Sequence, residues 1–401
     1  MTLEWRGRTL VITWLPVASM GRLAACAPQT AEETEVLAAL HDPTKHVVVG
    51  PAPSIRVTLG ECFGMPIGTN VEGKMVAALR RLGFDKVFDT NFGADLTIVE
   101  EANEFVDRVK NGGVLPMITS CSPGWVKFAE YYYPDQLDHL SSCKSPQQMT
   151  GAVIKTYYAE KMGIDPKDIV NVSVMPCTAK KFEIGREDED AAGVADIDIA
   201  ITTRELARMI QRAGIKFTAL PDEEFDAPLG EDTGAAVIFG ATGGVMEAAL
   251  RTANDWLTGE DNQAVEFTDV RGTAAIKEAA YNIAGLEVKV AVVSGIAGAN
   301  YVMNAIQNGT APWHFVEIMC CPGGCVNGGG QPTQPASVRN TVDLKALRAK
   351  ALYDQDAGMP LRKSHESPVI KKLYEEYFDG FGGHKAHHIL HTSYVGRKKF
   401  K

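Results

Sequence analysis

Three cysteines lie within six residues near the end of the chain, in a segment rich in glycine. They are Cys320, Cys321 and Cys325, and three consecutive glycines follow at 328–330. A metal cluster needs backbone that wraps closely around it, and glycine allows this because it has no Cβ and reaches positive φ without penalty. Cys321 and Cys325 are four residues apart, so one helical turn or a tight loop points them the same way. The segment predicts metal ligation rather than a glycine-rich surface turn.

Two further cysteines, Cys121 and Cys177, also stand beside or near a proline, as Cys321 does. Each follows a short apolar run that predicts a buried strand, and the runs are 114–118, 169–174 and 315–319. Strand ends of a sheet converge in space, so these cysteines and Cys325 supply four thiolates, the number that a 4Fe-4S cubane needs. Compact zinc sites usually pair two CxxC motifs, and this sequence has no such pair. The pattern therefore favours a buried iron–sulfur cluster.

The elements that position these cysteines alternate between strands and helices, which predicts a mainly parallel α/β fold. Further strands are expected at 46–50, 86–89, 197–201 and 288–293. Helices are expected at 31–40, 70–82, 94–111, 145–162 and 203–213, from Val245 onward, and in a charged C-terminal part at 344–354 and 367–378. Gly240–Gly244 resembles a phosphate-binding turn, but it lacks the lysine of a P-loop, so we do not expect nucleotide binding.

Composition limits the function classes. The chain has 401 residues, 45% of them hydrophobic, and a net charge of -10, which argues against a nucleic-acid partner. No apolar run reaches the roughly 18 residues of a membrane span. Eight cysteines are too few for a disulfide scaffold, which favours reduced thiols and a cytoplasmic location. Residues 23–26 resemble a lipoprotein cleavage box, so export or a lipid anchor at Cys26 is the alternative, although Pro16 interrupts the preceding apolar run.

Three segments resemble the signature segments of the catalytic domain of [FeFe]-hydrogenases. They are TSCSPGW at 119–125, MPCTAKKFE at 175–183 and EIMCCPGGCVNGGGQP at 317–332. The resemblance covers residues 46–395 and includes a C-terminal stretch similar to the small subunit of iron hydrogenases. It implies an N-terminal extension (1–45), a two-lobed α/β domain with flanking helices and the cofactor buried between the lobes (46–335), and a helical C-terminal segment (336–401).

The resemblance also implies the H-cluster, which is a 4Fe-4S cubane joined to a diiron centre with CO, cyanide and azadithiolate ligands. Cys177 and Cys321 would hold the cubane, Cys325 would bridge it to the diiron centre, and Lys180 would contact a cyanide. Cys121 would pass protons to the azadithiolate amine.

The residues that would line the diiron pocket are Pro53, Ser54, Gln147, Met175 and Met319. The rest of the proton path would be Glu101, Ser141, Glu104 and Arg108. Glu101, Glu104 and Arg108 also share one helical face at i, i+3 and i+7, although a solvated charged face is the plainer interpretation of that spacing alone.

One position departs from the family pattern. Ser122 stands where the family usually has a second cysteine that ligates the cubane. Three alternatives follow: Ser122 ligates as an alkoxide, Cys121 becomes the fourth ligand, or one iron stays open. We expect Cys320 to be a small packed residue rather than a thiol with a role at the cluster.

The resemblance implies reversible reduction of protons to H₂, a ferredoxin hydrogenase activity, with electrons from ferredoxin or another one-electron carrier and with diiron maturation proteins as assembly partners. The alternatives are an H₂-sensing or low-activity relative, an iron–sulfur assembly protein of the same superfamily, and an electron-transfer protein without a diiron centre. An acidic relay and Lys180 favour the enzyme over an assembly protein.

Overall fold

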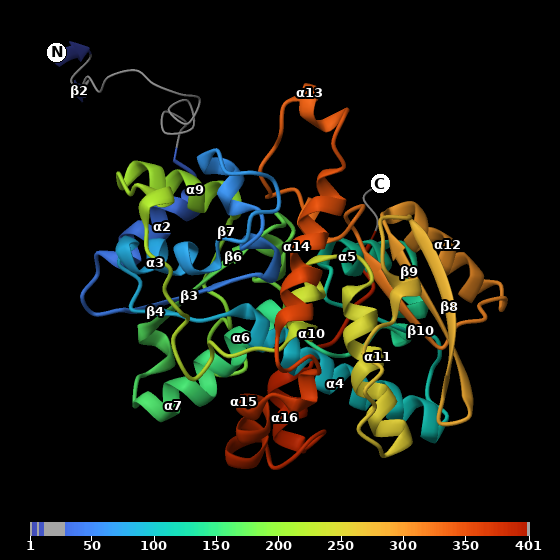
Figure 1. Ribbon diagram of the computed structural model, residues 1–401. Helices are drawn as coiled ribbons and strands as arrows, with labels where there is room; N and C mark the ends of the chain where they lie inside the picture. The colour runs from blue at the N-terminus through green and yellow to red at the C-terminus, as the bar shows by residue number, and fades with distance from the viewer. Residues whose placement is uncertain (1, 6–7, 12–28, 399–401) are drawn as a thin grey trace.

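Two four-stranded sheets organise the computed structural model, which describes residues 2–5, 8–11 and 29–398 (Figure 1). The first sheet has the order β4-β3-β6-β7 and all its pairs are parallel. The second has the order β5-β10-β9-β8, in which only β8 is antiparallel to its neighbour. The predicted α/β fold with mainly parallel sheets is thereby confirmed. The strands of the sheets are β3 (His46–Pro51), β4 (Lys86–Val87), β5 (Met117–Ile118), β6 (Ile169–Met175), β7 (Ile199–Thr202), β8 (Ile276–Ile283), β9 (Leu286–Ser294) and β10 (Phe315–Met319). A separate two-stranded pair joins β1 (Thr2–Trp5) to β2 (Arg8–Val11).

The central strands β3, β6 and β10 are buried on both faces, which explains why they are mostly apolar. Asn171, Ser173 and Glu317 are buried polar exceptions. In β3, Val47 and Val49 pack on one face while Val48 packs on the other. In β10, Phe315 and Met319 lie on one face, and Val316 and Ile318 on the opposite face.

The helices cover these faces in layers. On the first sheet, α2 (Ala31–Leu40), α3 (Glu72–Leu82) and α9 (Thr203–Arg212) cover one face. Its other face packs against α6 (Pro146–Val153), and α15 (Pro368–Leu373) and α16 (His384–Leu390) extend this core. The second sheet lies between α10 (Gly234–Val237) with α11 (Gly244–Thr258) and α5 (Pro123–Tyr132) with α12 (Ile296–Gln307). The remaining helices are α7 (Ala159–Met162), α8 (Lys180–Glu183), α13 (Ala336–Arg339) and α14 (Leu344–Gly358).

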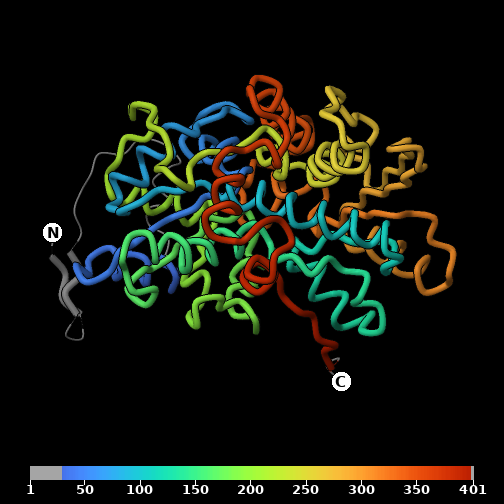
Figure 2. Tube along the Cα trace, turned by 90° about the horizontal axis from the view of Figure 1, so that it is seen from below, coloured from blue at the N-terminus to red at the C-terminus, as the bar shows by residue number. Residues whose placement is uncertain are grey.

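The long helix α4 (Thr90–Asn111) joins the two lobes, because its residues enter the cores of both. Asp89 caps its first turn by accepting a hydrogen bond from the Asn91 amide, and Gly112, at φ 73°, ends it in the left-handed conformation. The C-terminal segment lies across the centre of the molecule beside α4 (Figure 2).

Several elements differ from the sequence-based expectations. Strand β8 and helix α12 were not predicted, and the strand expected at 114–118 is limited to Met117–Ile118. Strand β8 alternates exposed or half-buried residues, Lys277, Glu278 and Asn282 among them, so it has no apolar run to identify it. The helix expected at 145–162 is continuous but passes through a π-helical turn at Ile154–Tyr158. The segment 23–26 lies outside the described residues.

The thiol-bearing strand ends belong to both sheets, not to one. Strand β6 leads to Cys177 in the first lobe, whereas β5 and β10 lead to Cys121 and Cys321 in the second. Parallel strands present their carboxyl ends at one edge, where ligands bind in open α/β sheets. The two such edges face one another across the centre of the molecule.

Candidate metallocluster site

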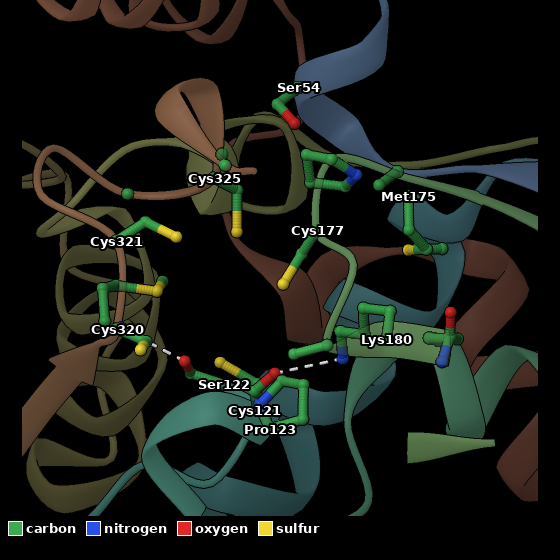
Figure 3. A pocket seen from close by; sticks show the side chains of 18 of the residues that line it. Ser54, Cys121, Ser122, Pro123, Met175, Cys177, Lys180, Cys320, Cys321 and Cys325 are labelled. Carbon is green, nitrogen blue, oxygen red and sulfur yellow. Dashed lines mark hydrogen bonds between the residues drawn. The ribbon is translucent and has the colours of Figure 1, made fainter. Parts of the chain in front are cut away.

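A cavity of about 280 Å³ lies between the two lobes, and the carboxyl ends of β3, β5, β6 and β10 supply its walls. All the residues expected to bind the cofactor line it (Figure 3). They are Pro53, Ser54, Cys121, Ser122, Gln147, Met175, Cys177, Lys180, Met319, Cys321 and Cys325. Cys320 lines it as well.

The thiols of Cys177, Cys321 and Cys325 point into one space from different walls (Figure 3). Close backbone packing makes this possible. Gly324 has φ 91°, and a Cβ there would lie 2.6 Å from the Thr242 amide nitrogen. A Cβ on Gly328 would lie 2.3 Å from the Pro176 carbonyl oxygen. Only glycine lets this segment pass so near the segment that carries Cys177.

The donor set suits an iron–sulfur cluster. Burial, together with the nearby Cys321 and Cys177, raises the pKa of the Cys325 thiol to about 12. Burial, together with the nearby Cys177 and Cys320, raises the pKa of the Cys321 thiol to about 11. Such thiols stay protonated without a cation, while iron favours the deprotonated form that ligates it. Converging soft thiolates in a dry cavity are the ligands that iron–sulfur clusters take, so the residues present fit the implied group.

Lys180 is held in place at the start of α8 by a buried network. Its Nζ donates to Glu183 Oε2 at 2.8 Å and to the Cys121 carbonyl oxygen at 3.1 Å. Burial alone would lower the pKa of Lys180, but the charge and hydrogen bonds of Glu183 outweigh it and raise the pKa above its usual value. Gln147 Nε2 donates to the same Glu183 oxygen at 2.9 Å. The pocket therefore contains a fixed ammonium group that remains charged.

Gln331 braces the opposite wall of the cavity. Its Nε2 donates to Ser54 Oγ at 3.1 Å and to the Cys325 carbonyl oxygen at 3.0 Å. Its Oε1 accepts from the hydroxyls of Thr58 and Thr203, both at 2.8 Å. One buried amide thus connects the first lobe to the turn that carries Cys325.

The expected proton-path residues lead away from Cys121 toward the surface. Glu101 is fully buried, and its carboxyl oxygens have no hydrogen-bond partner among the described residues. Burial, and then the charge of Glu104, raises its pKa to about 8. Ser141 Oγ donates to Glu104 Oε2 at 2.8 Å, and Arg108 pairs with Glu104 Oε1 at 2.6 Å. Glu101, Glu104 and Arg108 lie on one face of α4, as their spacing predicts. This face is buried at Glu101 and becomes partly exposed at Glu104 and Arg108.

Sequence reasoning missed several residues that complete the site. Glu183 could have been found from its i, i+3 spacing to Lys180. No local sequence pattern indicates the roles of Gln331 and His391, because most of their partners lie in distant parts of the chain. His391 Nε2 lies 3.0 Å from Glu100 Oε2, and its ring also approaches Cys143 and Glu104.

The glycine-rich turn at 240–244 has an internal partner. The amides of Gly243 and Met246 donate to the two carboxylate oxygens of Glu317, at 2.7 and 2.8 Å. This buried carboxylate takes the place that an anion would have at the start of α11. The resemblance to a phosphate-binding turn thus has a structural cause within the fold.

Fold and site together define a two-lobed α/β protein with a thiol-lined pocket of the kind that holds an iron–sulfur cluster. The model of the iron-only hydrogenase large subunit, C-terminal domain, matches residues 45–329, and that of the iron hydrogenase small subunit matches residues 342–397. The chain belongs to the iron-only hydrogenase family.

Individual relatives agree with this family. Iron hydrogenase 1 of Clostridium pasteurianum is 51% identical over 89% of this chain, and the match spans 62% of that protein's length. The structure of an apo [FeFe]-hydrogenase HydA1 variant from Chlamydomonas reinhardtii matches with a TM-score of 0.81 and 41% identity, covering 92% of this chain and 100% of that one. A more distant relative is the cytosolic iron-sulfur assembly component 3 of Bos taurus, 29% identical over 89% of this chain and 76% of the relative.

Among the described residues, no helix combines the length and the apolar character needed to cross a membrane.

Proposed function

We propose that the protein is an [FeFe]-hydrogenase that interconverts protons and electrons with H₂. One observation carries this proposal: a single pocket in which Cys177, Cys321 and Cys325 meet the Lys180 ammonium and the Cys121 thiol (Figure 3). When bound there, the H-cluster, with its 4Fe-4S cubane and its diiron centre carrying CO, cyanide and azadithiolate ligands, supplies the redox chemistry.

The cysteines divide between the two parts of this cofactor. Cys177, Cys321 and Cys325 would hold the iron–sulfur part of the cofactor, and the family resemblance assigns Cys325 to its junction with the diiron centre. For the remaining ligand position the sequence leaves three alternatives, which are Ser122, Cys121 and an open iron.

The residues that would line the diiron centre orient its ligands and offset their negative charge. Lys180 Nζ donates to both carboxylate oxygens of Glu183 and to the Cys121 carbonyl oxygen, which holds its positive charge at the wall where it would offset an anionic ligand such as cyanide. Gln147 is positioned through Glu183 and through the Ser173 hydroxyl, 2.8 Å from its Oε1. Pro53, Ser54, Met175 and Met319 exclude water from the remaining walls.

Protons move between the pocket and solvent through Cys121, Glu101, Ser141, Glu104 and Arg108. The raised pKa of Glu101, about 8, supports this role, because a carboxyl group that titrates near neutral pH can both take and give a proton. Ser141 adds a rotatable hydroxyl next to Glu104. Arg108 fixes the Glu104 carboxylate near the surface.

Electrons enter from ferredoxin or another one-electron carrier. Two cations support a docking site at the glycine-rich segment. The Lys345 side chain lies against Gly323, and Arg204 donates to the carbonyl oxygens of Gly329 and Gln331 at 2.9 and 2.6 Å.

Maturation proteins would deliver the diiron centre. We place the protein in the cytoplasm, which the free thiols of the pocket favour.

An H₂-sensing or low-activity form is the second candidate, and Ser122 at the pocket is the observation that favours it. The iron–sulfur assembly function of the distant relatives is less well supported, because assembly has no use for the buried acidic chain behind Cys121.

Activity of the matured protein tests the proposal. The chain would be coproduced anaerobically with diiron maturation proteins, and H₂ would be measured with reduced viologen and with reduced ferredoxin. We expect evolution of H₂ from both donors. Protein with a full iron content that makes no H₂ would support the sensing form instead.

A further inference from the structure

We infer that the Cys320 thiol is the fourth cysteine ligand of the cubane, in the place that Ser122 cannot fill as a thiolate. This inference rests on the iron–sulfur part of the proposed function and not on the diiron centre. It replaces the expectation that Cys320 is a small packed residue.

The position of Cys320 supports this role. It is half-buried at the junction of the pocket and the second lobe, and it lines the same cavity as Cys177, Cys321 and Cys325. It lies between Cys321 and Ser122 at the edge of the cavity (Figure 3).

Local packing keeps space for this thiol. Gly124 follows Ser122 at the start of α5, and a Cβ there would lie only 2.8 Å from Cys320 Sγ. The absent side chain at Gly124 thus leaves a place for the sulfur beside the cavity.

The Ser122 hydroxyl already has a structural partner. Its Oγ accepts a hydrogen bond from the Cys320 amide at 3.2 Å, which ties the first turn of α5 to the end of β10. A serine hydroxyl is also a weaker donor to iron than a thiolate, the ligand that cubanes take. Ser122 therefore positions the backbone of the residue that supplies the sulfur.

Cys121 belongs to a different set of neighbours. Its side chain packs against the core that includes α10 and α11, whereas that of Cys320 packs against the core that includes α5 and α12. The Cys121 carbonyl oxygen is held by Lys180. With Cys320 on the cubane, Cys121 stays available as the proton-carrying thiol.

Ligation itself exchanges protons for iron. Each cysteine thiol loses its proton to solvent as its sulfur binds an iron, so four thiolates complete a 4Fe-4S cluster. Reconstitution with ferric iron, sulfide and a dithiol therefore needs no maturation protein, because each dithiol that becomes a disulfide gives two electrons to four ferric ions, which is the number that the [4Fe-4S]2+ core requires.

The test compares single variants of the full chain after such reconstitution. Iron and sulfide per chain and the electron paramagnetic resonance spectrum of the reduced cluster would be measured for Cys320→Ala, Ser122→Ala and the control Cys62→Ala, whose thiol lies in the core of the first lobe. We expect Ser122→Ala and Cys62→Ala to keep about four irons per chain and the native spectrum, whereas Cys320→Ala has about three or fewer. The double variant Cys320→Ala/Ser122→Cys should regain the lost iron.

Several outcomes would overturn the inference. These are a native cluster in Cys320→Ala, loss of the cluster in Ser122→Ala alone, or a wild-type chain that assembles no cubane. The last result would also overturn the proposed function, whereas a cubane without CO and cyanide bands after maturation would overturn only the hydrogenase proposal.

A second measurement applies if Cys320→Ala does not fold. Wild-type protein would be alkylated with iodoacetamide before and after removal of iron by a chelator, and labelled cysteines would be mapped by mass spectrometry. We expect Cys320 to be labelled only after iron removal, together with Cys177 and Cys321. Equal labelling of Cys320 in both forms would contradict its role as a ligand.

Discussion

The Cys121 thiol occupies the point where the pocket meets the buried Glu101 carboxyl group. We expect Cys121→Ala to keep the cubane but to lower H₂ evolution by about 100-fold or more, the usual contribution of a positioned proton-transfer group. Iron content and viologen-driven H₂ evolution measure the two effects. Loss of the cubane in this variant would instead make Cys121 the fourth ligand.

Glu101 should make the stability of the cluster-free protein depend on pH. Its pKa is about 8 in the folded chain, against about 4.3 in an unfolded one. The folded state then binds more protons between these values, so this group lowers the free energy of unfolding as pH rises from about 4.3 to 8. We expect Glu101→Gln to flatten that decline and to gain at least about 1 kcal/mol relative to wild type by pH 8. Urea unfolding at pH 5 and pH 8 measures this, and parallel pH curves for the two proteins would show that Glu101 titrates normally.

Removing only one charge of the buried Lys180–Glu183 pair should lower the free energy of unfolding. Glu183→Gln leaves a buried ammonium without its counter-charge, so we expect a loss of roughly 3 kcal/mol in the free energy of unfolding. Changing both partners, in Lys180→Met/Glu183→Gln, removes the uncompensated charge and should cost less than the single change. Urea unfolding of the cluster-free variants tests this, and equal losses for single and double variants would show that the pair is not coupled.

At the scale of elements, the glycine-rich segment must pass close to the residues around Cys177. We expect Gly328→Ala to prevent cubane assembly, because its Cβ would lie 2.3 Å from the Pro176 carbonyl oxygen. The adjacent Gly329→Ala is a matched control, since the nearest atom to its Cβ is Thr178 Oγ1 at 3.7 Å. Iron content after reconstitution is the measurement, and equal incorporation in both variants would contradict this packing argument.

Much of the element order could be predicted from the sequence. Short, mostly apolar runs such as 46–50 and 315–319 identify strands that are buried on both faces. The buried Glu317 in the second run is accommodated by hydrogen bonds from the amides of Gly243 and Met246. Strand β8 has no such run, since it is an edge strand whose pairing with β9 is set by the hairpin. Helix α12 includes Gly298 and several polar residues, so its local propensity is weak.

The site was predictable where its chemistry is local. Cysteine, proline and glycine at three strand ends identify the pocket walls without any structure. Contacts such as those of Gln331 with Thr58 and Thr203 join residues more than 100 positions apart, so no local pattern could reveal them. The same reason applies to the role that we propose for Cys320, because its neighbour Ser122 lies 198 positions away in sequence.

At the scale of the whole molecule, the two lobes meet at the pocket and are tied together by α4 and the C-terminal segment. Arg348 of α14 joins these parts, because its guanidinium group binds Glu61 at 2.7 Å and the Val326 carbonyl oxygen at 2.8 Å. The family models match on either side of the expected boundary at residue 335, and the division into separate domains there stays a prediction.

The surface near the glycine-rich segment should favour an acidic carrier. We expect Lys345→Glu to raise the KM for reduced ferredoxin several-fold at low salt, because it replaces an attractive charge by a repulsive one. Turnover with viologen should be unchanged, and the difference should shrink as ionic strength rises. An unchanged KM for ferredoxin at low salt would place the docking site elsewhere.

The central claim is that this pocket holds an H-cluster, and the infrared spectrum of the protein matured with diiron maturation proteins tests it most directly. We predict bands from terminal CO and cyanide ligands, absent from protein produced without those partners, and a shift of the cyanide bands in Lys180→Met. A matured protein with a complete cubane but without any CO or cyanide band would contradict the claim.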